Sequence, residues 1–423
     1  MASGRHTGGS RSRIRRRARA FLVTCMGAVL AAASITAAPT QAAAATAPGK
    51  DPFYTPPSSL NGQPGDIIRS RQSVFTLAPI TKLPYPGVKS WQVMYQSTSA
   101  TGEPIAVTGT VLVPTKKWTG QGSRPLVSYG VGTRGLGDSC APSYTLSQGT
   151  DYEGLFIANA LNQGWAVAIT DMQGLGTPGM HTYEVGRAQG HAVLDMARAA
   201  LKLEAAGLNA QTPVGLMGYS QGGTSVGWAA QLADSYAPEL NLKGAATGGV
   251  PADLIAVADH LDGNMAVAFA FMAAVGFDAA YPELNLEGYL NDRGRQLLQR
   301  AQDVCLTSID GVVTLIDTAF DDIDDYVTTN PLNTEAWRNR LNEHKLGSIR
   351  PSVPVLQYQG RIDNIIPYGQ AATLRQDWCR LGANVTWRPD PIGTHVTGMV
   401  TYLPQATSFL ADRFAGKPVS GNC

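Results

Sequence analysis

The sequence predicts an α/β fold in which a mostly parallel central sheet is flanked by helices and interrupted by a helical insertion. Two observations indicate the sheet: short apolar runs recur along residues 91–249 and 353–388, and segments with helical spacing separate most of them. A third observation marks the insertion, because residues 251 to about 350 are rich in Ala and Leu and have almost no strand pattern. Strands that alternate with helices are joined by right-handed crossovers, which makes the sheet mostly parallel.

The first 42 residues are expected to be a secretory signal peptide. Residues 1–20 carry seven arginines and no acidic residue, residues 21–38 are apolar, and alanines follow around a cleavage site near Ala42. Two other kinds of export signal are disfavoured. A lipoprotein signal is disfavoured because Thr24 is unusual before the cysteine of a lipoprotein box, and a twin-arginine signal because no Arg-Arg pair stands in the required register. We therefore expect general secretion and an extracellular protein.

The charge of the mature chain excludes several kinds of partner. Removal of residues 1–42 takes away seven of the 33 basic residues and none of the 32 acidic ones, which leaves 26 basic residues and a net charge of −6. A mildly acidic chain lacks the basic surface that binds nucleic acid or anionic membranes. No further stretch is apolar enough to span a bilayer. We expect a monomer with no nucleic-acid partner and no transmembrane segment.

The cysteines also fit an exported protein. Four remain after the signal peptide: Cys140, Cys305, Cys379 and Cys423. An even number in an exported chain suggests two disulfides, for which three connectivities are possible. No Cys-x-x-Cys or His-x-x-x-His spacing suggests a metal site, so we expect chemistry without a metal or cofactor.

The mature chain divides into four segments. Residues 43–65 are rich in Pro, Ser and Gly and are expected to form an extended arm, while residues 66–250 and 351–423 form two parts of the core. Residues 251–350 are expected to be a helical cap, because the mature chain is longer than one hydrophobic core usually supports. The acidic run at 321–325 is expected to be the solvated face of a cap helix, with a calcium site as the alternative.

The individual elements follow from the spacing of apolar residues. Continuous or alternating apolar runs bounded by turn residues indicate strands, and apolar residues three or four apart indicate helices. Strands are expected at residues 91–97, 104–113, 124–131, 165–170, 243–249, 353–358 and 384–388. Helices are expected at residues 151–162, 186–206 and 224–233, and a last helix begins near Gly393.

The most informative stretch is Gly218-Tyr219-Ser220-Gln221-Gly222, a G-x-S-x-G pattern. A short apolar run precedes it and a helical segment follows it, which predicts a strand, a sharp turn and a helix. Glycines on both sides of Ser220 let neighbouring backbone pass closely, so the serine is held in a strained turn with its hydroxyl above the sheet edge. The alternative is a glycine-rich turn of a nucleotide-binding sheet.

An acid and a histidine follow Ser220 in an order that favours nucleophilic catalysis. Asp363 lies in the loop after the strand at 353–358, and His395 lies just before the last helix. A neutral imidazole can take the serine proton, and a fixed carboxylate stabilises the imidazolium that forms. We predict Ser220 as nucleophile, His395 as base and Asp363 as the acid that orients it. The α/β-hydrolase fold uses this order.

Two other residues compete for these roles. His181 follows the glycine-rich loop at 174–180 and is the alternative base, because the remaining histidines of the mature chain lie in helix-like segments or in the insertion. Asp171 follows a strand before Ser220 and is expected to shape a loop instead.

Two backbone N–H groups are expected to bind the oxyanion of the reaction. The first is that of Gln221, at the start of the helix after Ser220, where unpaired amides and the helix dipole favour negative charge. The second is expected from the loop at 132–134, where Thr133 and Arg134 remain equal candidates.

Several motifs together resemble the secretory lipase family, typified by lipase A of Candida antarctica. They are Ser128-Tyr129, Cys140-Ala-Pro-Ser143, the G-x-S-x-G pattern, Asp363-x-x-Ile-Pro367 and Gly393-Thr-His-x-Thr397. The likeness extends from about residue 70 to the end of the chain. It implies an α/β-hydrolase core, a helical cap inserted before the strand that carries the acid, and hydrolysis of carboxylic esters. It also implies the roles given above for Ser220, Asp363 and His395.

The resemblance further implies the disulfides Cys140–Cys305, which ties cap to core, and Cys379–Cys423, which holds the carboxyl terminus. The chain departs from the yeast enzyme in one respect: an acidic residue of the oxyanion loop there is replaced here by Thr133-Arg134, a pattern closer to bacterial relatives.

The sequence thus predicts a secreted serine ester hydrolase, in the first instance a triacylglycerol lipase, with water as second substrate and a lipid–water interface as its place of action. A short-chain carboxylesterase, an acyltransferase and an inactive hydrolase-fold binding protein are the alternatives. Residues 266–275, which include Phe269 and Phe271, are apolar on all sides and form either the core of the cap or a wall for an acyl chain.

Overall fold

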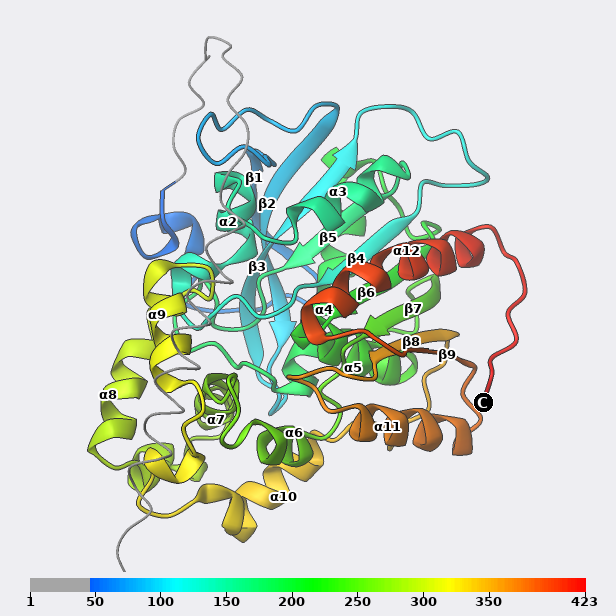
Figure 1. Cartoon of the computed structure of the whole chain (residues 1–423). Helices are drawn as coiled ribbons and strands as arrows, with labels where there is room; N and C mark the ends of the chain where they lie inside the picture. The colour runs from blue at the N-terminus through cyan, green and yellow to red at the C-terminus, as the bar shows by residue number, and fades with distance from the viewer. Residues whose placement is uncertain (1–45) are drawn as a thin grey trace, which may run out of the picture.

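The computed structural model of the chain describes residues 46–423 and is drawn in Figure 1. The expected signal peptide at residues 1–42 lies outside the described residues. In the part that is described, no helix is long and apolar enough to cross a membrane.

The centre of the molecule is a nine-stranded sheet with the order β1-β2-β3-β5-β4-β6-β7-β8-β9. The strands are β1 Ile67–Ser73, β2 Val88–Thr98, β3 Pro104–Pro114, β4 Leu126–Gly130, β5 Ala166–Thr170, β6 Val214–Tyr219, β7 Leu242–Gly248, β8 Val355–Gly360 and β9 Val385–Asp390. The first three strands and β5 pair antiparallel. From β5 to β9 all neighbours are parallel, which confirms the predicted sheet.

Helices cover both faces of this sheet (Figure 1). They are α2 Pro142–Gln148, α3 Gly154–Asn162, α4 Gly186–Lys202, α5 Gln221–Tyr236, α11 Tyr368–Arg380 and α12 His395–Phe414. Successive strand residues point to opposite faces, so Leu216 packs with residues of α4 and α5, whereas Met217 packs with residues of α3 and α12. The strands are therefore buried on both sides, as their continuous apolar runs require.

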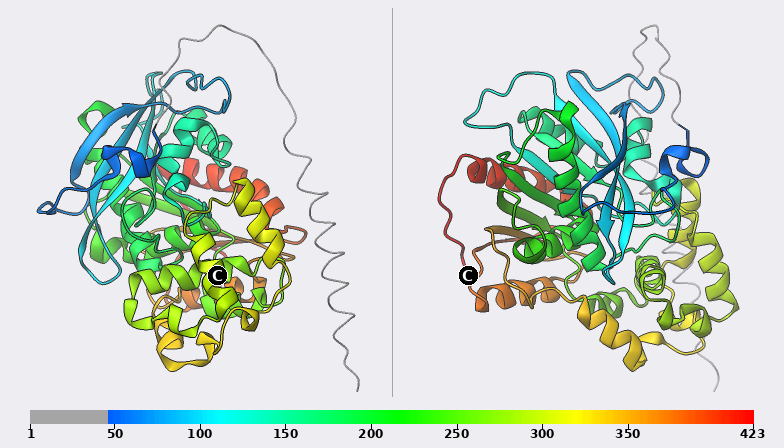
Figure 2. Two further views of the ribbon diagram at one scale, coloured as in Figure 1. Left: turned by 90° about the vertical axis from the view of Figure 1, so that its left-hand side faces the viewer. Right: turned by 180° about the vertical axis from the view of Figure 1, so that it is seen from behind.

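The segment between β7 and β8 is helical, as predicted. Its helices are α6 Leu254–Leu261, α7 Ala268–Ala280, α8 Asp292–Ala301, α9 Ile309–Thr318 and α10 Glu335–Glu343. Figure 2 shows from two further directions that these helices lie together beside the sheet. They pack around a hydrophobic core that includes Phe277, Tyr281 and Trp337, and Tyr183 and Val185 from before the cap join this core. We refer to these five helices and their connections as the cap.

Two expectations for irregular segments are corrected by the structure. Residues 46–65 are not extended throughout, because two short 3₁₀ turns, Pro48–Lys50 and Pro52–Tyr54, bring the Tyr54 ring into the core, where its hydroxyl lies 2.8 Å from Ser143 Oγ. The acidic run does not form a helix face, since residues 323–325 make a 3₁₀ turn and Asp321 is buried in an ion pair with Arg293. Among the described residues, no cluster of three or more His, Cys, Asp or Glu side chains could hold a metal ion.

Candidate active site

Ser220 occupies a strained turn between β6 and α5. Its φ of 59° and ψ of −124° lie in a region that non-glycine residues rarely adopt, at a cost of about 1–3 kcal/mol. The adjoining glycines are required by close packing: a Cβ atom at Gly222 would lie 2.0 Å from Gly130 O, and one at Gly218 would lie 2.3 Å from Gly222 O. The structure therefore has the strand, sharp turn and helix that the G-x-S-x-G pattern predicts.

The turn brings Ser220 into a chain of hydrogen bonds with His395 and Asp363. His395 Nε2 lies 2.9 Å from Ser220 Oγ. On the other side of the ring, His395 Nδ1 lies 2.9 Å from Asp363 Oδ2 and 3.1 Å from Oδ1. The Asp363 side chain is fully buried, and that of His395 is 11% exposed. The three predicted residues thus meet, although they are up to 175 positions apart in the sequence.

Asp363 is held in place by donors from its own loop and from the end of β8. Its Oδ1 accepts hydrogen bonds from the backbone N–H groups of Ile365 at 3.0 Å and Ile366 at 2.8 Å, and its Oδ2 accepts one from Gln359 Nε2 at 3.1 Å. Because these donors favour an ionised carboxylate, the Nδ1 that faces it carries the imidazole proton. Nε2 is then free to accept the proton of the Ser220 hydroxyl.

His395 is positioned by the start of α12. Thr394 caps this helix in a reciprocal arrangement with Thr397, which fixes the turn that carries the histidine. The Tyr219 hydroxyl donates a hydrogen bond to His395 O at 2.9 Å. Tyr219, the second residue of the G-x-S-x-G pattern, therefore links the serine turn directly to the histidine.

His181 and Asp171, the alternatives to the histidine and the acid of the site, have other partners. His181 Nδ1 is 2.8 Å from Gln173 O, so this nitrogen must donate, and Nε2 then accepts from Gln221 Nε2 at 3.0 Å. Burial lowers the pKa of His181 to about 4, which keeps it neutral. Asp171 accepts hydrogen bonds from Ser143 N and Thr108 Oγ1, both at 2.7 Å, and so shapes a loop as expected. Neither is bonded to Ser220.

Ser220 and His395 open into a cavity of about 360 Å³ beneath the cap. Its walls are largely apolar and include Leu254, Val257, Phe269, Phe271, Leu297 and Trp337. Helix α7 contributes to two environments, because Phe269 and Phe271 line the cavity whereas Val275 and Phe277 are buried in the core of the cap. Residues of the 266–275 stretch thus contribute both to the core of the cap and to the cavity wall, and a role as wall for an acyl chain stays a prediction.

The sequence profile of secretory lipases matches residues 141–422. The chain belongs to the secretory lipase family. This membership confirms the resemblance seen in the motifs, implies ester substrates and supports a hydrolase that acts outside the cell.

Similar proteins differ in the activity that their names give. The chain is 35% identical to a protein of Mycobacterium tuberculosis named a probable inactive lipase, over 88% of this chain and 84% of that one. It is 30% identical to a secreted triacylglycerol lipase of Malassezia furfur, over 89% of this chain and 81% of the relative. Among solved structures, Candida antarctica lipase A in its closed state superposes with a TM-score of 0.78 at 29% identity, covering 89% of each chain. These matches confirm the α/β-hydrolase fold.

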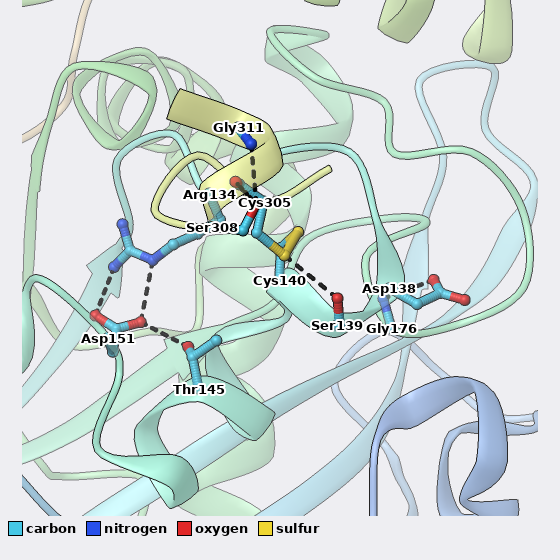
Figure 3. The surroundings of a disulfide bond; sticks show 10 residues. All are labelled: Arg134, Asp138, Ser139, Cys140, Thr145, Asp151, Gly176, Cys305, Ser308 and Gly311. Carbon is cyan, nitrogen blue, oxygen red and sulfur yellow. Dashed lines mark hydrogen bonds and ion pairs between the residues drawn. A yellow bond between two sulfur atoms is a disulfide. The ribbon is translucent and has the colours of Figure 1, made fainter. Parts of the chain in front are cut away.

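The loop at 132–134 of this lipase is fixed by buried charges. The Glu153 carboxylate accepts the Gly132 N–H at 3.2 Å and pairs with Arg134 at 3.1 Å. Arg134 also pairs with Asp151 at 2.9 Å, and Figure 3 shows its guanidinium directed toward that residue. Burial alone would lower the pKa of Arg134, but the two carboxylates raise it well above its usual value, so the group stays charged.

The two candidates for the second oxyanion donor are placed differently by this arrangement. Thr133 lines the cavity together with Ser220, its hydroxyl lies 2.7 Å from Tyr183 Oη, and no described residue accepts a hydrogen bond from its N–H. Arg134 is not among the residues that line the cavity. The Gln221 N–H lies at the first position of α5, where helical amides have no partner within the helix.

A disulfide joins the cap to the segment that follows this loop. Cys140 is bonded to Cys305, and the two residues beside Cys305 pair with the loop backbone: Leu136 N donates to Val304 O at 3.1 Å, and Leu306 N donates to Arg134 O at 2.8 Å. Figure 3 shows the bridge close to Arg134. The second disulfide, Cys379–Cys423, joins α11 to the carboxyl terminus. Both pairings are those that the resemblance implies.

Sequence reasoning missed several residues of the site. Glu153 anchors the loop at Gly132, Tyr219 holds His395, and Tyr183 and Glu184 line the cavity beside Ser220. Tyr219 stands at a variable position of the G-x-S-x-G pattern and no motif marks the other three, since each acts through a contact with another segment of the chain.

Proposed function

We propose that this secretory lipase is a serine ester hydrolase that works through an acyl-enzyme on Ser220. The observation that carries the proposal is the unbroken hydrogen-bond chain from Ser220 Oγ through His395 to Asp363. Its order and geometry are those of an activated serine.

In the first half of the reaction, Ser220 Oγ attacks the ester carbonyl carbon while His395 Nε2 takes the hydroxyl proton. The negative oxygen of the tetrahedral intermediate is bound by the backbone N–H groups of Gln221 and Thr133, of which the second is favoured over Arg134 because Thr133 lines the cavity. When the intermediate collapses, His395 gives its proton to the departing alcohol. Asp363 stays ionised throughout and stabilises the imidazolium.

In the second half, water attacks the carbonyl carbon of acyl-Ser220. His395 now takes a proton from the water and returns it to Ser220 Oγ as the carboxylic acid leaves. No cofactor takes part in these steps.

The substrate class follows from the cavity and from the relatives. An apolar cavity of about 360 Å³ beside Ser220 suits the acyl chain of a lipid ester. Ile392 and Val400, which are 78% and 57% exposed, lie on either side of His395 in the chain and provide apolar surface for a lipid–water interface. Since a relative from Malassezia furfur is a secreted triacylglycerol lipase, we favour triacylglycerols as substrates.

The organisation proposed around this site is a signal peptide at residues 1–42, an N-terminal arm at 43–65, a core at 66–250 and 351–423, and a cap at 251–350. The mature protein is proposed to be an extracellular monomer.

The test is a comparison of kcat/KM over p-nitrophenyl esters from acetate to palmitate, together with hydrolysis of a triolein emulsion. Ser220→Ala and His395→Ala should each lower turnover by roughly 10³-fold or more without unfolding the protein. A maximum at long chains with emulsion hydrolysis supports a lipase. Activity confined to short esters makes the protein a carboxylesterase, and transfer to added alcohols in preference to water makes it an acyltransferase.

A second candidate, an inactive hydrolase-fold binding protein, is raised by the name of the Mycobacterium tuberculosis relative. It predicts no turnover of any ester by the folded wild-type protein.

A further inference from the structure

The cavity beside Ser220 contains a carboxyl group with no partner. Glu184 lines this cavity, both of its carboxyl oxygens are buried, and neither is hydrogen-bonded to any described residue. The other acidic residue of the lining, Glu153, is bonded to Arg134 and to Gly132 N. Buried carboxyl groups are almost always paired, because an unpaired one loses its hydration without compensation. The lack of a hydrogen-bond partner for the Glu184 carboxyl is therefore unusual.

The position of Glu184 is next to the serine turn. It lies in the short turn that leads into α4, directly after Tyr183, whose hydroxyl contacts the Thr133 side chain. Across from it is Thr224, one helical turn after Ser220 on α5. The Thr224 hydroxyl is near enough to influence the Glu184 carboxyl, but it donates its own hydrogen bond to Pro251 O at 3.3 Å. The Glu184 carboxyl therefore lines the same cavity as Ser220.

The backbone at Glu184 is also strained. Its φ of 61° lies in the left-handed region, where glycine is favoured, and such a conformation costs about 1–3 kcal/mol. A residue that is both strained and unpaired does not contribute to stability, and such sites cluster where a protein binds or reacts.

The Glu184 carboxyl is neutral under ordinary conditions. Burial raises its pKa to about 8, although the nearby Thr224 hydroxyl opposes part of this rise. A neutral carboxyl group can donate one hydrogen bond and accept others. Its natural complement is a hydroxyl group, which also donates and accepts.

We propose that Glu184 binds a hydroxyl group of the ester substrate within this cavity, and that the enzyme prefers esters with a hydroxyl near the reacting carbonyl to fully apolar ones. The inference rests on the proposed function, because it assigns a substrate preference to the same site. The hydroxyl could be carried by the acyl chain, as in a hydroxyacyl ester, or by the alcohol part, as in a partial glyceride.

The test uses matched pairs of esters, with kcat/KM as the readout. One pair compares 2- and 3-hydroxydecanoate esters with the decanoate ester of the same alcohol, and the other compares monodecanoylglycerol with ethyl decanoate. We expect the wild type to favour the hydroxylated member of one pair by roughly tenfold to a hundredfold, the range expected when a buried polar group is left unpaired by the other member. Which pair shows the preference identifies the source of the hydroxyl.

Three variants separate binding from a structural role. Glu184→Gln keeps a donor and an acceptor in the same shape and should retain most of the preference. Glu184→Leu removes the donor and the acceptor and should lose the preference. Glu184→Gly suits the left-handed backbone and removes the side chain, so it reports on the preference even if the leucine variant does not fold.

The outcomes are distinguishable from a failure of the proposed function. If the wild type hydrolyses all of these esters with ratios near one, or if the ratios are the same in Glu184→Gly as in the wild type, the inference is overturned while the ester hydrolase stands. If no ester is hydrolysed by the folded wild type, it is the proposed function that fails.

Discussion

The two disulfides should contribute similarly to stability but very differently to activity. The Cys140–Cys305 bridge closes a loop of 165 residues, and restriction of the unfolded chain then predicts a stabilisation of about 5 kcal/mol. The Cys379–Cys423 bridge closes 44 residues, for which the same relation predicts about 4 kcal/mol. Replacing either pair by serines should therefore lower the free energy of unfolding by comparable amounts.

The difference in activity follows from where the bridges lie. Residues on both sides of Cys305 are hydrogen-bonded to the backbone at Arg134 and Leu136, next to the proposed oxyanion donor Thr133. Without the bridge, the loop loses one of its attachments to the cap. The Cys140→Ser/Cys305→Ser variant should lose roughly tenfold or more in kcat/KM, up to the ~100-fold that removal of one oxyanion donor costs. The matched Cys379→Ser/Cys423→Ser variant should stay within about twofold of the wild type.

The assay is urea unfolding followed by circular dichroism, with kcat/KM measured on a soluble ester at 25 °C, where both variants remain folded. Equal kcat/KM values for the two folded variants would refute the argument that the first bridge holds the oxyanion loop.

Three further predictions concern side-chain substitutions. Glu184→Gln should stabilise the protein at pH 8 but not at pH 4. The pKa of Glu184 is about 8 in the folded protein and 4.5 in the unfolded chain, so ionisation of the unfolded chain favours unfolding as the pH rises between these values. Urea unfolding at both pH values tests this, and equal effects of the substitution would contradict it. His181→Gln should make the free energy of unfolding depend less on pH between pH 6.5 and 4. The pKa of His181 is about 4 in the folded protein and 6.5 in the unfolded chain, so the wild type loses about 3 kcal/mol of stability as the pH falls through this range. An unchanged slope of unfolding free energy against pH would count against this prediction. Ile392→Ser with Val400→Ser should lower hydrolysis of a triolein emulsion by roughly tenfold while activity on a soluble ester is kept, and equal losses on both substrates would exclude an interfacial role.

The parallel strands could be predicted because their signal is local. Each is a short apolar run buried on both faces, and the bounds found for β5 and β7 differ from the predicted ones by only a residue or so. The edge strand β1 was missed because its residues, including Arg69 and Arg71, are half-buried and charged. Such a strand is defined by its partner β2 and not by its own apolar pattern.

In the site, too, residues with a local signal could be predicted, whereas contacts that depend on the folded chain could not. Ser220, Asp363 and His395 could be proposed because each stands in a recognisable turn at the end of a strand, and the fold brings those ends together. The environment of His181 could not be predicted, since it depends on Gln173 and Gln221, which approach it from other parts of the chain. The cysteine count left three pairings open for a related reason, because a pairing depends on distances between residues that only the folded chain defines.

The acidic run illustrates how composition can mislead. Five residues with four aspartates suggest a solvated surface, yet Asp321 is buried against Arg293, and Asp322 and Asp325 cap a short turn. Charge patterning reports on exposure only where no partner is brought in by the fold.

The central claim is that Ser220 is an activated nucleophile, and reaction with a fluorophosphonate tests it most directly. The folded mature protein should gain the mass of one covalent adduct, which peptide mapping locates on Ser220, while Ser220→Ala should gain none. An unmodified wild-type protein, or an adduct on another residue, would contradict the account.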